Sequence, residues 1–267
     1  MRRLPVAAFA ALVIATVAAF FVTQHLKVTT PLIAGFPAPV PATINPVTGG
    51  TCLVRNGKGG LAPTSFRKMK VSFYLLNRAD DVDVYIVDRN GAIVDTLPGS
   101  GRHLGTKKRR EFVWDGREDS GRVAPDGVYY VRVALVHQGR TLLISNDSGP
   151  EPVTVQTTSP RLAVTAVSPR ALTPPGPVTI HYAGNDGLRP RILIYRLVAG
   201  VGAKPVKNYA ATTRSGTSVW DGTIRGRPAA AGTYLVGLKL VDRTCDVVRY
   251  PKPVAAASAP QAVLAIR

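Results

Sequence analysis

The tripeptide Trp114-Asp115-Gly116 recurs as Trp220-Asp221-Gly222, and together the two copies hold both tryptophans of the chain. Each copy is followed, at a closely matching distance, by a glycine and then by a Gly-x-Tyr sequence. These residues are Gly121, Gly127 and Tyr129 after the first copy, and Gly226, Gly232 and Tyr234 after the second. Self-similarity of this kind indicates a repeated structural unit. The sequence therefore predicts two related units in tandem.

The residue types of the Trp-Asp-Gly motif suit a turn at the end of a strand. A buried tryptophan is a large apolar anchor whose indole N–H can meet a backbone carbonyl. The aspartate can accept backbone N–H groups of the following turn, and the glycine adopts backbone angles that other residues resist. We expect a structural role for both motifs. The alternative is that exposed indole rings stack on a sugar.

Apolar and polar residues alternate on both sides of each motif, which predicts half-buried strands. Asn90-Gly91 predicts a hairpin turn in the first unit. Each unit spans roughly 100 residues, the size of an immunoglobulin-like sandwich. We therefore predict an all-β fold with two tandem immunoglobulin-like β-sandwiches. The alternation covers residues 69–75, 82–86 and 129–135 in the first unit, and 178–182, 192–194 and 234–240 in the second.

The N-terminal segment predicts a transmembrane anchor or a signal sequence. Arg2 and Arg3 precede an apolar stretch, Leu4 to Val22, that contains no charged residue. Its length suits a single membrane-crossing helix, and the arginines favour a cytoplasmic N-terminus with the two sandwiches outside. The alternative is a signal peptide cleaved near Val17-Ala18-Ala19, which would give a secreted protein. Both alternatives place the repeated units outside the cytoplasm.

These features divide the chain into five segments. A spacer rich in proline is expected to be extended, and a C-terminal tail rich in alanine and proline is expected to be disordered or loosely packed. The segments are a transmembrane anchor or signal sequence (1–26), the Pro-rich spacer (27–50), the first sandwich (51–157), a divergent second sandwich (158–253) and the tail (254–267).

The chain contains two cysteines: Cys52 opens the first unit, and Cys245 comes after the last strong strand of the second. Outside the cytoplasm two cysteines usually pair. A bridge between them would close a very long loop and stabilise the fold by about 4–5 kcal/mol in the chain-entropy model. It requires Cα atoms within about 7 Å, so free or intermolecular thiols remain the alternative. Neither cysteine has a histidine at ligand spacing, and no metal site is predicted.

The formal net charge of +18 at pH 7 creates a field that attracts anions. The densest basic run is a possible anion-binding patch, and a merely solvated basic surface is the alternative. No aromatic residues are interleaved with it, so nucleic acid is not expected as a partner. The patch consists of Arg102, Lys107, Lys108, Arg109 and Arg110.

The first unit resembles FlgD-type immunoglobulin-like domains, named after the flagellar hook-capping protein. The resemblance rests on a strand at 82–88, Asn90-Gly91, a return strand at 94–97, and the segments 114–121 and 123–129. The second unit keeps the Trp-Asp-Gly motif and Gly232-Thr233-Tyr234, but its hairpin lacks Asn-Gly. The whole chain is similar to actinobacterial envelope proteins. The resemblance implies β-sandwiches used for assembly or adhesion.

No pattern in the chain indicates catalysis. The histidines are scattered, and no nucleophile elbow, phosphate loop or zinc-helix signature is present. Asp80, Asp81 and Asp83 are interpreted as solvated carboxylates at a strand edge rather than as a paired acid and base. We predict no catalytic, cofactor-binding or metal-binding residues.

The predicted function is that of a non-enzymatic, membrane-anchored, extracytoplasmic structural or protein-interaction module of the cell envelope. Its expected partners are the membrane, through the N-terminal helix, and an envelope protein. The alternative function is binding of anionic envelope polysaccharide through basic surface patches.

Overall fold

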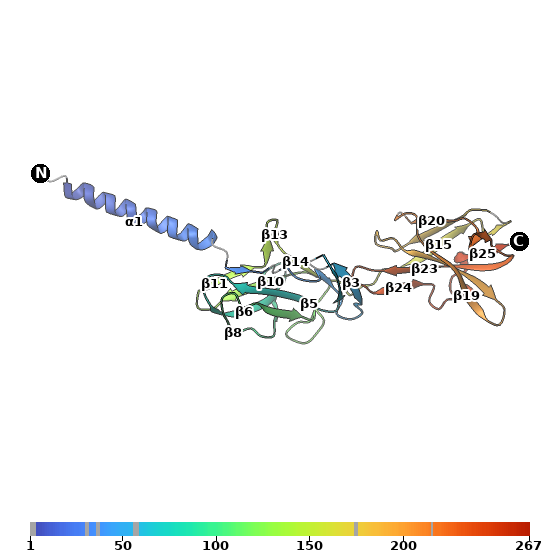
Figure 1. The fold of residues 1–267 in the computed structure, drawn as a ribbon, viewed down its shortest axis with the longest axis horizontal. Coiled ribbons are helices and arrows are strands. Elements are labelled where there is room, and N and C mark those ends of the chain that lie inside the picture. Colours follow the sequence, from blue (N-terminus) through green and yellow to red (C-terminus); the bar gives the residue numbers. More distant parts are fainter. Residues whose placement is uncertain (1–3, 30–31, 36–37, 56–58, 174–175, 215) are drawn as a thin grey trace.

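The computed structural model describes residues 4–29, 32–35, 38–55, 59–173, 176–214 and 216–267, and it describes the side chains of the N-terminal helix at residues 8–22. One helix, α1 (Leu4–Thr29), is followed by two β-sandwiches that lie one after the other along the long axis of the molecule (Figure 1). The arginines at positions 2 and 3, which supported the predicted membrane orientation, lie outside the described residues.

The first sandwich encloses one hydrophobic core between two sheets. The smaller sheet has the order β1-β5-β9, and the larger has the order β2-β14-β10-β6-β7, with β11 paired to β10 and β8 paired to β6. Inward residues of β5 alternate with outward ones, as the sequence predicted. The strands are β1 (Ile33–Ala34), β2 (Thr43–Ile44), β5 (Met69–Leu75), β6 (Asp80–Val87), β7 (Ile93–Thr96), β8 (Arg102–Leu104), β9 (Arg110–Trp114), β10 (Gly127–Leu135), β11 (Arg140–Leu143) and β14 (Pro152–Val155).

Part of the predicted spacer, residues 27–50, belongs to this sandwich. β1 pairs with the end of β5, Val40 pairs with Lys70, and β2 runs parallel to β14. Ile44 is completely buried in the core. The prediction of a free spacer is therefore corrected: prolines limit the length of its strands, but the short segments between them still pair and bury apolar side chains.

The second sandwich repeats the arrangement of the first. A three-stranded sheet, β15-β17-β20, faces a sheet of order β16-β25-β23-β18-β19, in which β24 also pairs with β23. A second, separate hydrophobic core lies between them. The strands are β15 (Ala163–Ser168), β16 (Ala171–Leu172), β17 (Val178–Ala183), β18 (Arg191–Val198), β19 (Gly202–Ala210), β20 (Thr217–Trp220), β23 (Gly232–Val241), β24 (Val247–Tyr250) and β25 (Val263–Ile266).

The predicted loose tail, residues 254–267, is in fact part of this second core. After two short 3-10 turns, η1 (Ala256–Ser258) and η2 (Pro260–Ala262), the chain enters β25. This strand lies between β23 and β16, and Leu264 is 1% exposed. The prediction was wrong because the composition of the whole segment concealed four residues that alternate between intermediate and buried positions.

Three small hairpins complete the β structure. The first, β3 (Thr51–Arg55) with β4 (Leu61–Ser65), lies at the end of the first sandwich that faces the second (Figure 1). The others are β12 (Ser145–Asn146) with β13 (Gly149–Pro150), and β21 (Thr223–Ile224) with β22 (Arg227–Pro228). The β3–β4 hairpin is thus placed to connect the two sandwiches.

The segment predicted as a transmembrane anchor does form helix α1, and its described apolar side chains, such as Phe9 and Phe21, are exposed. Within the part of the chain that the structure describes, however, no helix combines the length and the apolar character needed to cross a bilayer. A crossing requires about 20 predominantly apolar residues. The prediction of a membrane-spanning helix is corrected accordingly.

The buried position of β25 can be tested by truncating one side chain. Replacing Leu264→Ala removes a fully buried side chain and leaves a cavity, so we expect the free energy of unfolding to fall by about 2–5 kcal/mol. Val254→Ala, at an exposed position of the same segment, is the control and should have little effect. Chemical denaturation of both variants measures the difference. Equal, small losses in both would show that the segment does not contribute to the core.

Candidate functional site

The two Trp-Asp-Gly motifs form the same corner, which carries the chain from one sheet of a sandwich to the other. Trp114 ends β9 and is completely buried, and Trp220 ends β20 and is 1% exposed. The indole Nε1 of Trp114 donates a hydrogen bond to the Arg117 carbonyl oxygen at 2.7 Å. That of Trp220 donates to the Thr223 carbonyl oxygen at 2.9 Å. Both indoles are anchors, and neither offers a face for stacking on a sugar.

The aspartate and glycine of each motif shape the turn after the tryptophan. The Asp115 carboxylate accepts the Arg117 backbone N–H at 3.1 Å, and Asp221 accepts that of Thr223 at 2.9 Å. Gly116 and Gly222 have φ angles of 76° and 72°, in the left-handed region that favours glycine. The two turns therefore use the same backbone geometry for the same purpose.

A tyrosine from the next long strand closes each corner. The Tyr129 hydroxyl donates to the Pro125 carbonyl oxygen at 2.7 Å, and the Tyr234 hydroxyl donates to that of Ala230 at 2.6 Å. The ring centroids of each Trp–Tyr pair lie 5.3 Å apart in the first sandwich and 5.8 Å apart in the second. The other motif glycines take part in the same segments: Gly121 and Gly226 have positive φ angles, and Gly127 and Gly232 begin β10 and β23.

The two corners differ in what holds them to the neighbouring edge strand. In the first sandwich Asp119 bonds to β7: its backbone N–H donates to the Val94 carbonyl oxygen at 3.0 Å, and its carboxylate accepts the Thr96 N–H at 2.9 Å. In the second, Lys207 of β19 donates to the Asp221 carboxylate at 2.7 Å. This hydrogen bond contributes most to lowering the pKa of Asp221 to about 2.

Asp80 corrects the prediction that the carboxylates at the start of β6 are solvated. It is 1% exposed and accepts the backbone N–H groups of His137 and Gln138 at 2.8 and 3.0 Å, together with the His137 ring Nδ1 at 3.0 Å. Burial acts to raise the pKa of Asp80, but these hydrogen bonds outweigh it and lower the pKa to about 2. Asp80 therefore fixes the β10–β11 turn to β6. These contacts account for its burial without a catalytic role.

The junction between the sandwiches is covalently closed. Cys52 of β3 and Cys245, in the turn between β23 and β24, form a disulfide with their Cα atoms 6.0 Å apart. The sequence alone did not decide between this disulfide and free or intermolecular thiols. Beside it, the Gly50 backbone N–H donates to the Thr244 carbonyl oxygen at 2.9 Å. A β-carbon at Gly50 would collide with the Cys245 carbonyl oxygen, so the close approach requires glycine at this position.

Three further polar residues order the junction, and sequence reasoning missed all of them. The buried Asp242 accepts hydrogen bonds from the Thr244 N–H and hydroxyl, both at 2.8 Å, and so shapes the turn that carries Cys245. The carboxylate of Asp126 accepts the Thr157 N–H at 2.7 Å. The Ser159 hydroxyl donates to Asp246 at 3.2 Å, across the junction. The Asp-x-Thr spacing of Asp242 and Thr244 is a local signal for a turn. No local sequence signal indicates the long-range hydrogen bonds of Asp126 and Ser159.

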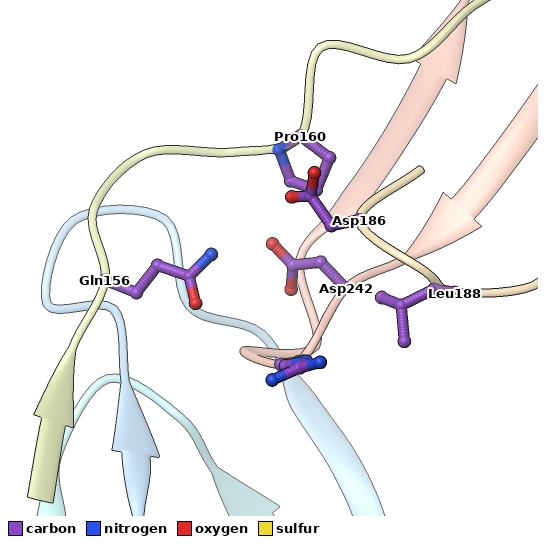
Figure 2. A pocket seen from close by; sticks show the side chains of 6 residues that line it. Gln156, Pro160, Asp186, Leu188 and Asp242 are labelled. Atoms are coloured by element: carbon purple, nitrogen blue, oxygen red, sulfur yellow. The ribbon is translucent and has the colours of Figure 1, made fainter. Parts of the chain in front are cut away.

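A small polar pocket lies at this junction (Figure 2). The Gln156 amide from the end of β14 and the carboxylates of Asp186 and Asp242 point toward a common space, which has a volume of about 220 Å³. Organic ligands usually occupy pockets of about 300–1,000 Å³ with predominantly apolar walls. Among the described residues, no three or more histidines, cysteines and carboxylates come together as a metal site. The remaining lining residues are Pro160, Leu188 and Arg243.

The predicted basic patch lies at the opposite end of the first sandwich. Arg102 is on β8, Lys107, Lys108 and Arg109 are in the following loop, and Arg110 begins β9. The Arg109 guanidinium donates to the Gly35 carbonyl oxygen. Arg110 is partly buried, and its Nη1 has no hydrogen-bond partner among the described residues. Four of the five residues, Arg102, Lys107, Lys108 and Arg109, are therefore exposed, and Arg110 is not.

Comparison with known proteins gives a match to a family model and a number of similar solved structures, three of which follow. Residues 62–139 match the model of the FlgD Ig-like domain. The chain is 13% identical to dimeric latent PorU from Porphyromonas gingivalis (TM-score 0.30, covering 84% of this chain and 18% of that one). It is 11% identical to a marsupial T cell receptor, with a TM-score of 0.40 over 88% of this chain and 72% of that one. It is 19% identical to FLGD from P. aeruginosa, with a TM-score of 0.21 over 59% of this chain and 92% of that one. No curated protein matches the chain.

The family match lies within the first sandwich, where residues 62–139 extend from β4 to the turn between β10 and β11. The match to the family model does not extend into the second sandwich. The likeness of the two units therefore rests on their paired corners, with the same indole, aspartate and tyrosine hydrogen bonds in each.

Asp95 provides a test by pH. Burial and the neighbouring carboxylates of Asp119 and Asp115 raise its pKa from 3.8 to about 6. Between these values the folded state binds more protons than the unfolded state, so the free energy of unfolding should fall as the pH rises through this window. Asp95→Asn should remove that decline and restore about 1–2 kcal/mol at pH 7. Thermal unfolding across pH 4–7 measures it, with the exposed Asp147→Asn as control. An identical decline in both variants would contradict this assignment.

Removing the disulfide should loosen the junction without unfolding either sandwich. In the Cys52→Ser/Cys245→Ser variant both cores should remain folded, because neither cysteine is part of a core, while the two sandwiches gain freedom relative to one another. Small-angle X-ray scattering should then show a broader distance distribution, and proteolysis at residues 157–160 should become faster. Asp126→Asn, which loosens the linker but keeps the bridge, should change scattering much less. Unchanged scattering in the double serine variant would show that the noncovalent contacts fix the junction alone.

Proposed function

We propose that this chain is a non-enzymatic structural or protein-interaction module that works outside the cytoplasm, in the cell envelope. The observation that carries the proposal is the Cys52–Cys245 disulfide. Disulfides persist in oxidising compartments and are rare in the cytosol. The apolar stretch from Leu4 to Val22 supports export, whether it is retained or removed afterwards.

Two features support a binding role over catalysis. Residues 62–139 match the FlgD Ig-like domain. The tryptophans of both motifs are buried and serve to hold turns. The two sandwiches, fixed by the disulfide, would present their outer faces to a protein partner in one constant arrangement.

The test uses the full chain, tagged at its C-terminus and expressed in its native cells. Alkylation before and after reduction should show a disulfide rather than free thiols, and fractionation should recover the protein outside the cytoplasm. Crosslinking followed by purification should recover one protein in stoichiometric amount, and less of it with the Cys52→Ser/Cys245→Ser variant. A cytoplasmic protein with free thiols, or the absence of any stoichiometric partner, would contradict the proposal.

A second candidate function is binding of anionic envelope polysaccharide. The supporting observation is that Lys107 and Lys108 are exposed and form no ion pair with any described residue. Burial of both indoles removes the two tryptophans as platforms for stacking on sugars. Binding through the lysines would depend on charge and should weaken when the salt concentration is raised. Salt-resistant binding to a neutral glycan would contradict this candidate.

A further inference from the structure

The predicted basic patch of the first sandwich lies at the end from which α1 extends. β8 and the β10–β11 turn are at this end, and the second sandwich is at the other (Figure 1). The backbone N–H of Lys107 donates to the Leu75 carbonyl oxygen at 3.0 Å, and the N–H of Leu76 donates to the Leu32 carbonyl oxygen at 3.1 Å. The basic loop and the segment after α1 are therefore held to adjacent residues of the same strand end.

A side-chain contact ties the loop to the same segment. The Arg109 guanidinium donates to the carbonyl oxygen of Gly35, directly after β1. Arg109 is thus used to position the loop, which leaves the neighbouring lysines to face solvent. Lys107 also has a positive φ angle of 60°, so the loop makes a sharp turn at the exposed residue rather than continuing as a strand.

The charge at this end is unbalanced. Asp80 and Asp81 are the acidic residues at the start of β6, and each already faces a histidine, His137 and His103 respectively. Several cations at this end have no acidic partner among the described residues. Those that are exposed and not used to position the loop are Arg78, Arg102, Lys107 and Lys108, so their field is directed outward.

We propose that this basic end of the first sandwich binds the headgroups of anionic lipids. The argument combines charge with position. The described side chains of α1 are exposed and, except for Thr16, apolar, and α1 leaves the sandwich beside the unpaired cations. An apolar segment next to a cluster of lysine and arginine is the pattern by which proteins associate with anionic bilayers.

A lipid surface fits this end better than a polymer chain does. Neither Lys107 nor Lys108 lines the junction pocket or the pocket beside the β6–β7 turn. Both indoles are buried and cannot stack on sugar rings. Exposed cations that are not gathered in either pocket suit an extended charged plane, where each contact is with a separate headgroup.

The test measures partition of the full chain, with its disulfide intact, between buffer and vesicles. The vesicles are phosphatidylcholine alone, or phosphatidylcholine mixed with phosphatidylglycerol. Binding to neutral vesicles measures the contribution of the apolar side chains of α1. The ratio of the partition coefficient for anionic vesicles to that for neutral vesicles therefore isolates the contribution of charge. We expect a ratio well above one that falls as salt is added.

The variant Lys107→Gln/Lys108→Gln should lower this ratio about 25-fold, since each cation near an anionic surface strengthens binding about five-fold. The control is Lys204→Gln/Arg227→Gln, which removes two exposed cations from the second sandwich and should leave the ratio unchanged. Thermal unfolding confirms that both variants are folded.

Three results would overturn the inference. The first is a ratio near one for the unmodified chain, and the second is an equal loss in both double variants. The third is binding of the unmodified chain to a soluble anionic polysaccharide, abolished by Lys107→Gln/Lys108→Gln, without preference for anionic vesicles. The inference goes beyond the proposed protein-binding role, and either can fail alone, because the vesicle assay contains no protein partner and the crosslinking assay does not depend on lipid charge.

Discussion

Burial of one indole at the crossover between two sheets is the constraint on which each sandwich depends. Trp114 ends a strand of the smaller sheet, and the next long strand, β10, belongs to the larger one. The chain must change sheets within this turn while keeping the core closed. The indole fills the gap and donates its N–H to the turn itself, and Tyr129 packs against its ring. Losing such a side chain typically costs about 3–5 kcal/mol, a large share of the stability of a domain.

The second sandwich uses the same solution with different support. Its corner keeps the indole, aspartate and tyrosine contacts, but a lysine from β19 replaces the Asp119 contact with β7. The backbone of the turn is therefore preserved while the connection to the edge strand varies. This explains why the family model matches within the first sandwich only: the shared geometry requires few residues, and the surrounding sequence is free to diverge.

The sequence was sufficient to predict the strands that build each core, because their period of two is long enough to recognise. It was insufficient for β1, β2 and β25, which are too short to show a pattern and which form only because longer strands offer them free edges. Asp80 was misread for a related reason. Its burial depends on the backbone N–H groups of His137 and Gln138, which are 57 and 58 residues away along the chain. The sequence around Asp80 does not indicate these partners.

The site residues divide in the same way. The corner residues could be assigned from type and spacing, whereas the junction could not. Gly50 and Ser159 acquire their roles only where the two sandwiches meet, and the partner of Asp126, Thr157, is 31 residues away along the chain. The basic run was visible in the sequence, but its nearness to the end of α1 depends on the pairing of β1 with β5.

The position of the disulfide determines how the molecule would respond to tension. Cys52 and Cys245 are separated by 193 residues, and that interval includes the central strands of both sandwiches, from β5 to β23. A stretching force applied between the two chain ends would pass from Cys52 directly to Cys245. Only the segments outside the covalent loop could then be extended, and most of both cores would remain mechanically unloaded.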